Sequence, residues 1–320
     1  MQDSQAQDDR VSLSSPDAMP EGDGLYPIRT VSTLTGVNPV TLRAWERRYG
    51  LVRPQRTPKG HRLYTDADIE RIHRILELLQ QGIPIGQARR LIDSAGAPEP
   101  AASRSHSEDP WSDFRARMTR AIERFDEDAL NATYNEALSL YPVDLVSRLL
   151  VLPLLEQLRP RWAREAVGPA EAHFFSAYMR NKLGARLHHH YGIPGRGPRL
   201  MAAGLPGEAC EVELLLFALA ALTQGYRMVL LGANMPLAPL QPAAEKAAAR
   251  AIVLFGSSDP DADTLQRALP ALVAGVDCPV CVGGRVAERH GEAVRAAGAV
   301  ALAGGVSQSL AQIYQALGRP

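Results

Sequence analysis

The sequence predicts a multidomain protein of mixed α and α/β class: a winged helix-turn-helix head, then a helical bundle, then a flavodoxin-like doubly wound parallel sheet. Three observations predict it. Two short capped helices and a glycine-containing hairpin fall within residues 24–93, long amphipathic stretches fill 113–191, and apolar segments alternate with helical ones over 197–320. At 320 residues, the chain is long enough for two or three separate cores.

The charge of the chain is unevenly distributed, although its 35 basic and 35 acidic residues cancel. Residues 24–93 hold 12 Lys and Arg against 6 Asp and Glu, a net charge of +6, so the remainder carries −6. Most of that negative charge lies in residues 1–23, where Arg10 is the only basic residue. A basic module beside a near-neutral body predicts a polyanionic partner for that module.

The composition also predicts where the domains begin and end. Residues 1–23 lack apolar periodicity, so we expect a disordered acidic tail, and the small residues and prolines of 94–112 predict a linker. The first residues have no basic and apolar leader pattern, and no apolar run approaches membrane-spanning length. Three cysteines do not make a disulfide framework, so a cytoplasmic protein is expected.

The head begins with two helix signals. Thr30 is a candidate N-cap for a helix over 31–35 that Gly36 ends, and Asn38-Pro39 starts a second helix that reaches Tyr49-Gly50. Leu42, Trp45 and Tyr49 share one face of this second helix and should pack inward. The residues away from that stripe, which make an arginine-rich face sized for a major groove, are Thr41, Arg43, Arg47 and Arg48.

A basic hairpin should follow the second helix. Short extended pieces flank a Pro58-Lys59-Gly60 turn, which is typical of a β-hairpin wing. Its cations, suited to phosphate contact, are Arg53, Arg56, Lys59, His61 and Arg62. Thr65 then caps a third helix with Ile69, Ile72, Leu76 and Leu79 as its buried stripe, and a last short helix follows Pro84.

The run NPVTLRAWERRYGLVRPQRTPKGHRLY, residues 38–64, closely resembles the winged-helix head of MerR-type regulators, in the subgroup of the CarH/LitR photoreceptor repressors and the curli-gene activator MlrA. An arginine-rich face alone could be no more than the solvated surface of a small helical domain. Here the helix, the wing and the third helix all keep the family's spacing, which favours DNA binding. The resemblance, together with the exposed Arg48, implies contacts with double-stranded promoter DNA from Thr41, Arg43, Arg47, Arg48, Tyr49, Arg56, Lys59, His61 and Arg62.

The rest of the chain should form two domains of different fold class. Amphipathic stretches at 114–121, 128–141, 143–159 and 168–190 predict a bundle, with Leu145, Leu149, Leu152 and Leu155 on one apolar face. Apolar segments at RLMAAG, RMVLLG, AIVLFG, PVCVGG and AVALAG then predict buried parallel strands separated by helices. Ligands of such sheets bind above the carboxyl ends of the strands.

This order of bundle and sheet is similar to the cobalamin-binding module of CarH/LitR regulators and methionine-synthase-type proteins. Gly283-Gly284 matches the family's glycine pair, and Trp162 and His173 match side chains over the cofactor's upper face. Ser257 follows the third strand at the ligand edge. The resemblance thus implies a candidate cofactor set of Trp162, His173, Cys210, Ser257, Gly283 and Gly284.

Departures from that family's pattern concentrate at the same site. The family's lower cobalt ligand is a histidine in Glu-x-His-x-x-Gly, whereas this chain has Cys210 for the histidine and Glu213 for the glycine. Ala172 replaces a glutamate before His173, and Glu171 stands one place too early. A thiol must deprotonate before it binds a metal, which an imidazole need not do. We therefore expect a retained fold without cobalamin.

Three further sequence patterns are open to more than one interpretation. Cys278 and Cys281 form a C-x-x-C pattern, typical of redox or zinc sites, but on a buried strand packing is favoured over redox sensing. The histidines 188–190 are either a metal tract or the polar end of a helix, and we favour the latter. Residues 204–207 lack dinucleotide-binding spacing, and no hydrolytic set stands out, so no enzyme is indicated.

Taken together, these features predict a homodimeric promoter-binding regulator that acts on RNA polymerase indirectly, through the shape of promoter DNA. Pro98 and Pro100 interrupt the region where such regulators often carry a long dimerisation helix, so another surface should hold the pair. Two alternatives stay open. One is an adenosylcobalamin-dependent, light-sensing regulator, and the other is the partner protein of a corrinoid-dependent methyltransferase.

Overall fold

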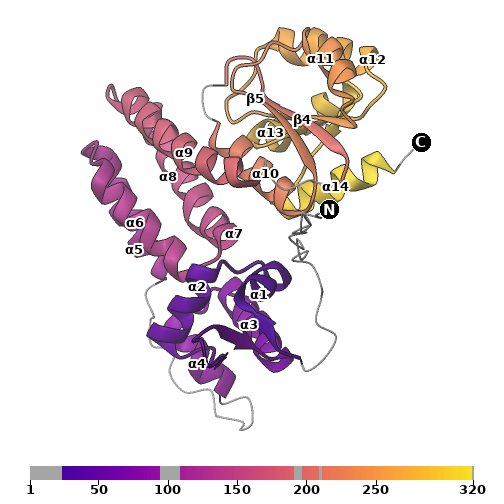
Figure 1. The fold of residues 1–320 in the computed structure, drawn as a ribbon. Helices are drawn as coiled ribbons and strands as arrows, with labels where there is room; N and C mark the ends of the chain where they lie inside the picture. Colours follow the sequence, from indigo (N-terminus) through magenta and orange to yellow (C-terminus); the bar gives the residue numbers. More distant parts are fainter. Residues whose placement is uncertain (1–23, 94–108, 191–196, 209–210, 319–320) are drawn as a thin grey trace, which may run out of the picture. The chain divides into compact units, whose positions relative to one another are not determined.

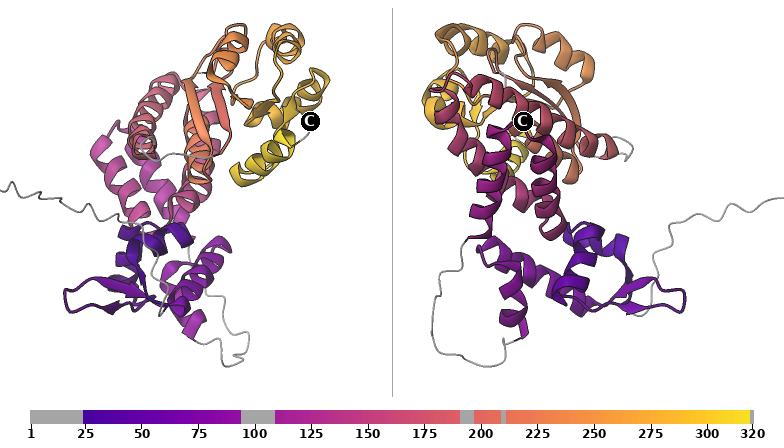
Figure 2. Two further views of the ribbon diagram at one scale, coloured as in Figure 1. Left: turned by 45° about the vertical axis from the view of Figure 1, so that its right-hand side comes forward. Right: turned by 90° about the vertical axis from the view of Figure 1, so that its left-hand side faces the viewer.

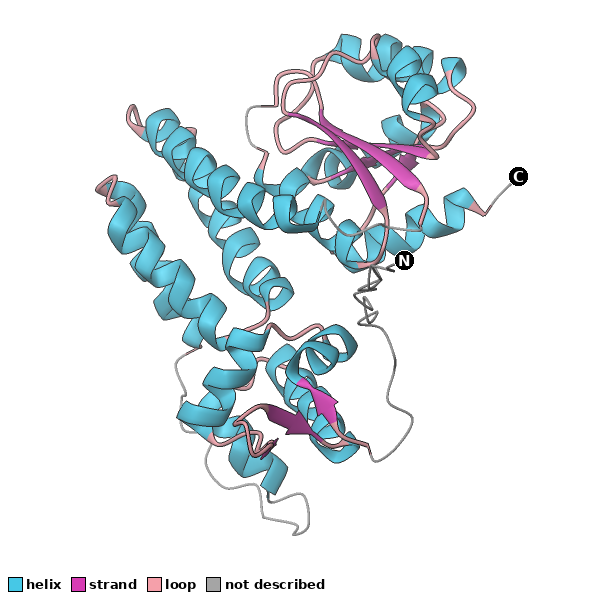
Figure 3. Ribbon diagram, viewed as in Figure 1, coloured by secondary structure: helices cyan, strands magenta, loops and turns pink. Residues whose placement is uncertain are grey.

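The computed structural model describes residues 24–93, 109–190, 197–208 and 211–318. They fall into two compact units, divided at residue 100 (Figure 1). The predicted tail 1–23, most of the predicted linker and Cys210 lie outside the described residues, as do the side chains of His189 and His190. Figure 3 shows short strands among helices in the first unit and a larger sheet within the second.

The first unit is the predicted winged helix-turn-helix. Strand β3 lies between β1 and β2 and is antiparallel to both, with Gln55 opposite Leu63 and Tyr26 opposite Tyr64. The elements are β1 (Tyr26–Pro27), α1 (Ile28–Thr35), α2 (Pro39–Ala44), the π-helical turn η1 (Trp45–Tyr49), β2 (Gln55–Arg56), β3 (Arg62–Tyr64), α3 (Asp66–Gln80) and α4 (Ile85–Asp93).

The turn between the first two helices forms as the sequence predicts. Gly36 ends α1 in the left-handed region, with φ of 71°, and the Asn38 side chain accepts a hydrogen bond from the Val40 amide at 2.8 Å. Thr30, however, is not the N-cap, because α1 starts at Ile28, directly after the extended Pro27. Strand β1 was not predicted either, since a two-residue strand leaves no periodicity to read.

Helix α3 is capped as predicted but buries a different face. Its buried side chains are Ile72, Ile75, Leu78 and Leu79, whereas Ile69 and Leu76 are half-buried. The predicted stripe was therefore wrong at two of four positions. The reason is packing: α3 contacts both α1 and α4, so its buried surface is wider than one stripe and turned towards the two helices.

The second unit begins with the predicted bundle. Helix α5 starts at Pro110, inside the predicted linker, because Asp109 accepts a hydrogen bond from the Trp111 amide and the buried Trp111 ring packs 4.5 Å from that of Tyr141, centroid to centroid. The elements are α5 (Pro110–Glu123), α6 (Glu127–Leu140), α7 (Val143–Val146), η2 (Ser147–Val151), α8 (Leu152–Trp162) and α9 (Gly168–His190).

The π-helical turn η2 shifts the bundle's buried face. Leu145 and Leu155 are buried as predicted, but Leu149 and Leu152 are only half-buried, and Leu150 and Leu154 take their places in the core. A π-helical turn contains more residues than an α-helical one, so an α-helical count across it misplaces the residues that follow.

The sheet is parallel throughout, in the order β5-β4-β6-β7-β8, which is the flavodoxin-like order. Helices cover both of its faces (Figure 2), and α11, α12 and α13 share one core with the strands. The strands are β4 (Arg199–Gly204), β5 (Arg227–Gly232), β6 (Ala251–Phe255), β7 (Val280–Gly283) and β8 (Val300–Ala301), and the helical elements are α10 (Val212–Thr223), α11 (Leu240–Ala247), η3 (Thr264–Ala268), α12 (Leu269–Gly275), α13 (Arg285–Ala296) and α14 (Val306–Leu317).

Thr65→Ala should destabilise the first unit by about 1 kcal/mol, because it removes a reciprocal cap. The Thr65 hydroxyl accepts from the Asp68 amide at 3.1 Å, and the Asp68 carboxylate accepts from the Thr65 amide at 2.9 Å. Urea unfolding of the full chain checks this, with the exposed Thr33→Ala as control. Equal midpoints for the two variants would contradict the cap.

Candidate nucleic-acid interface and ligand site

The second helix of the head, α2 with η1, exposes a row of arginines. Arg43, Arg47 and Arg48 are exposed, and within the described residues none of them pairs with a carboxylate. Trp45 and Leu42 are fully buried beneath them, as predicted. Burial of one face thus fixes the direction in which the other face presents its three cations.

Two residues of the predicted interface are less exposed than its arginines. Thr41 is fully buried, so its assignment to the exposed face was wrong: it lies one turn before Trp45 and faces the core with it. Tyr49 was predicted to be both buried and near DNA, and it is half-buried. The wider turn η1 takes Tyr49 out of the buried stripe of Leu42 and Trp45.

The wing forms where the sequence places it. Arg56 of β2 lies opposite Arg62 of β3 in the antiparallel register, and Gly60 closes the turn with φ of 81°. Inside the turn the Thr57 hydroxyl accepts from the His61 amide at 3.0 Å, which holds the loop in one shape. Lys59 and His61 are exposed at the tip. The wing therefore presents cations on a closed turn.

Glu46 joins the wing to the helix, a role that sequence reasoning missed. Its two carboxylate oxygens accept from Arg56 at 2.7 Å and from Arg62 at 2.5 Å. Arg62 is only 13% exposed, so it positions the wing, whereas Arg56 is 52% exposed and keeps a free side. The spacing of 10 and 16 residues between these partners is not a pattern that a sequence reveals.

A side chain of α3 anchors the segment that follows the C-terminal end of the recognition helix. Arg71 on α3 donates to the carbonyl of Leu51 at 2.5 Å and also pairs with Asp93 on α4 at the same distance. Leu51 follows Gly50, which ends the helix in the left-handed region at φ of 57°. The chain therefore leaves the helix and enters the wing along one fixed path.

In the second unit, the two residues of the predicted upper-face pair differ in burial. Trp162 is buried, and its indole N–H donates to the carboxylate of Glu171 at 3.0 Å. Arg161 donates to the same carboxylate. His173 is exposed, two residues further along α9, where a helix turns its side chains by about 200°. Glu171 thus binds Trp162 in the interior of the bundle, whereas His173 lies on the surface.

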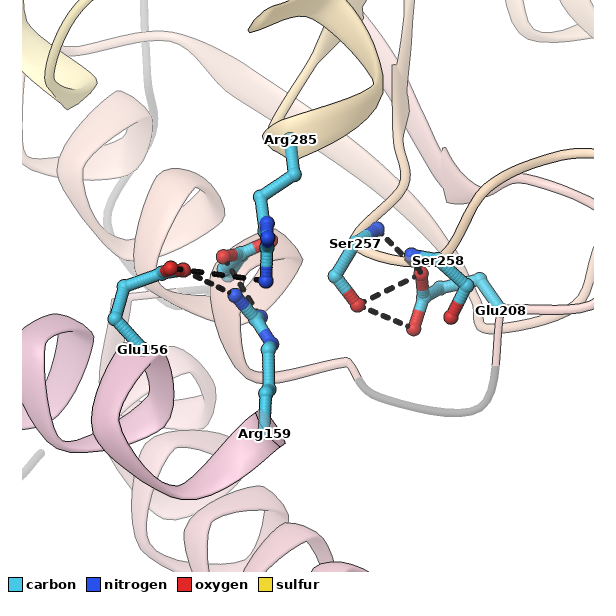
Figure 4. A network of polar contacts seen from close by, with 7 residues as sticks. Glu156, Arg159, Glu208, Ser257, Ser258 and Arg285 are labelled. Atoms are coloured by element: carbon cyan, nitrogen blue, oxygen red, sulfur yellow. Dashed lines mark hydrogen bonds and ion pairs between the residues drawn. The ribbon is translucent and has the colours of Figure 1, made fainter. Parts of the chain in front are cut away.

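The loops at the carboxyl ends of the strands are tied together by a buried carboxylate. Glu208 accepts hydrogen bonds from the amides of Ser257 and Ser258, at 2.5 and 3.0 Å, and from the Ser257 hydroxyl (Figure 4). Ser257, a predicted cofactor residue, is therefore engaged by the protein itself. The position of Cys210 lies outside the described residues.

Ion pairs link the bundle to this edge of the sheet. Arg159 on α8 donates to Glu213 on α10 at 2.8 Å and to Glu156 at 2.5 Å, and Arg285 at the start of α13 lies 3.7 Å from Glu156 (Figure 4). Glu213 is 15% exposed, and burial raises its pKa even though Arg159 opposes that shift. A second pair, Arg180 with Glu211, is also 2.8 Å long.

The predicted glycine pair is explained by internal packing. A Cβ on Gly283 would stand 2.9 Å from the Phe255 ring, and one on Gly284 would stand 2.7 Å from the carbonyl of Gly256 and 3.2 Å from the Glu213 carboxylate. Gly284 also has φ of 75°, which disfavours other residues. Side chains of this chain therefore occupy the space beside both glycines.

The cysteine pair has the character of core packing. Cys278 and Cys281 are both free thiols, and Cys281 is buried in β7. Burial, with a smaller contribution from Cys278, raises the pKa of Cys281 to about 12. A thiol held protonated is a poor nucleophile, so the structure favours packing over redox sensing.

His188 is exposed near the end of α9. Within the described ranges no three His, Cys, Asp or Glu side chains gather as a metal site. None of the helices in those ranges combines the length and the apolar character that crossing a bilayer requires.

Comparison with known proteins supports the same division. Residues 26–95 match the model of the MerR HTH family regulatory proteins, and residues 115–187 match that of a B12 binding domain. The HTH-type transcriptional repressor CarH of Myxococcus xanthus is 32% identical over 275 residues, which are 83% of this chain and 90% of that protein. The chain belongs to the MerR family of helix-turn-helix regulators.

Two further relatives show how far the MerR-family likeness extends. The repressor CarA of M. xanthus is 29% identical over 85% of this chain and 91% of its own length. The regulator MlrA of Salmonella typhimurium is 34% identical over 135 residues, which are 42% of this chain and 52% of MlrA. The predicted membership and the predicted subgroup are confirmed.

Glu46→Gln should lower the free energy of unfolding by roughly 1–2 kcal/mol at pH 7. Burial opposes ionisation, but hydrogen bonds from Arg62 and Arg56 outweigh it and lower the pKa of Glu46. A lowered pKa stabilises the fold above the carboxyl's ordinary value and loses that effect as pH falls through the lowered value. The deficit of the variant should therefore persist from pH 7 down to about pH 5 and shrink as the pH falls further towards about pH 3 in urea unfolding.

The matched control is Glu77→Gln, whose exposed pair with Arg74 should contribute little at either pH. A deficit of Glu46→Gln that stays constant with pH would show that the interaction with Arg56 and Arg62 is not ionic.

Proposed function

We propose that this MerR-family protein regulates transcription by binding a pseudo-palindromic promoter site as a homodimer. The observation that carries the proposal is the Glu46 bridge, which sets the helix with Arg43, Arg47 and Arg48 and the wing with Lys59 as one cationic surface. A helix fits the major groove, and the flanking wing meets phosphates. Two heads of a dimer match two half-sites.

The proposed effect on transcription, through deformation of promoter DNA, is inferred from the MerR family and not from any residue of the site. A dimer that bends or untwists the promoter changes its fit to RNA polymerase without touching the enzyme, and the energy of such deformation depends on sequence. The curated relatives are regulators by name, which also favours a non-enzymatic, cytoplasmic role. The corrinoid-methyltransferase alternative has no support in the DNA-binding head.

Two substitutions test the surface. Arg43→Ala should weaken binding to a selected duplex more than to a scrambled one, because a helix arginine reads base edges. Lys59→Ala should weaken both equally and lower the slope of log K against log salt by about one, because it removes one phosphate contact. Fluorescence anisotropy from 50 to 300 mM salt measures both. An unchanged slope for Lys59→Ala would refute the wing assignment.

We also propose that the second unit works without cobalamin. The fit is poor on the residues themselves: Glu213 and Arg159 pair at the ligand edge, Phe255 lies against Gly283, and Trp162 is bonded to Glu171. Cys210 replaces the histidine that the family uses, and the imidazole of His290 near the strand ends is engaged with Asp259 at 3.1 Å. Breaking the part-buried pair of Arg159 and Glu213 to admit a cofactor has a free-energy cost that binding would have to offset.

Purified protein incubated in the dark with adenosylcobalamin and then desalted should therefore show no visible corrin absorbance. The control is the variant Cys210→His/Glu213→Gly, which restores the family's pattern and should retain more of the cofactor. A stoichiometric coloured complex of the unaltered protein would overturn this proposal and revive the light-sensing alternative, but it would leave the DNA-binding proposal standing.

A further inference from the structure

A second basic feature of the head lies beside the recognition helix. A groove of about 490 Å³ runs between α1, α2 and the wing, lined among others by Arg29, Arg43, Thr57, Gly60 and His61. We name it the α1 groove. All of its lining residues belong to the first unit, and none of them is acidic. Three elements of the fold thus contribute to one hollow.

The groove concentrates positive charge that the protein itself does not neutralise. Arg29, Arg43 and His61 are exposed, and within the described residues no ion pair engages any of them. Arg62 also lines the groove, but Glu46 holds it at 2.5 Å. Arg29 and Arg43 repel each other when no carboxylate lies between them, so an anion bound there stabilises the pair.

The backbone adds to this preference. Helix α1 begins beside the groove at Ile28, has no side-chain cap and has no acidic residue in its first turn. The first amides of a helix lack partners within it and favour negative charge. Gly60, with φ of 81° and open space where a Cβ would stand, keeps the wing side of the groove uncovered.

We infer that the α1 groove holds one phosphodiester of the DNA backbone, and that Arg29 is a further DNA-contacting residue, on a helix outside the predicted interface. This inference rests on the proposed function. Arg43 borders the groove on the side of the recognition helix and His61 on the side of the wing, so a phosphate held by Arg29 would lie between them. Such a contact fixes the head's register on the duplex and carries no base information.

The test pairs one side chain with one phosphate. The full-length protein selects a duplex from a random library, and a series of copies is made in which a single phosphate is replaced by a neutral methylphosphonate. At one position per half-site, neutralisation should weaken binding of the unaltered protein about tenfold. For Arg29→Ala the same replacement should change affinity less than twofold, because the interaction is already lost.

Two controls make the result specific. Arg74→Ala removes an exposed arginine of α3 outside the groove and should keep the full profile of the unaltered protein. Arg29→Lys keeps the charge and should restore part of the sensitivity. Melting curves of the three variants should coincide, since the side chain of Arg29 is exposed.

Three outcomes would overturn the inference. Arg29→Ala could respond to every phosphate as the unaltered protein does, or it could bind the unmodified duplex equally well. Inorganic phosphate could also compete with the duplex through Arg29 better than chloride at matched ionic strength, which would make a free anion the ligand. Failure to select any duplex would instead refute the proposed function.

Discussion

The DNA-binding surface depends on one carboxylate. A recognition helix and a wing, each rich in arginine, would repel each other if nothing negative lay between them. Glu46 lies on the helix itself and accepts from Arg56 and Arg62 on the two wing strands. It pairs with the mostly buried Arg62 and with the exposed Arg56, and it leaves the three exposed arginines of the helix unpaired among the described residues.

The second unit uses buried carboxylates in a similar way, with a different result. Glu171, Glu208 and Glu213 each satisfy donors from another element, beside residues that the cobalamin-binding resemblance assigns to a ligand. These internal contacts support the proposal that the second unit works without cobalamin, because a ligand would have to break them.

Much of this was predictable because local signals agreed. The Asn38 cap, the Gly36 stop and the alternation of apolar strands with helices are short-range patterns, and the structure confirms each. The burial of Thr41 was misjudged although it lies one turn before the buried Trp45, whereas the half-exposure of Tyr49 was misjudged because a π-helical turn changes the residue count. Glu46 was missed because its partners are distant in the sequence and only folding brings them together.

The proposed function requires that the head recognise a particular duplex rather than polyanions in general. The most direct measurement is the ratio of affinities of the full chain for a selected duplex and for a scrambled duplex of equal composition, taken in 150 mM salt. We expect a ratio of at least about a thousand. A ratio within a few-fold of one would contradict it, because charge alone would then explain the binding.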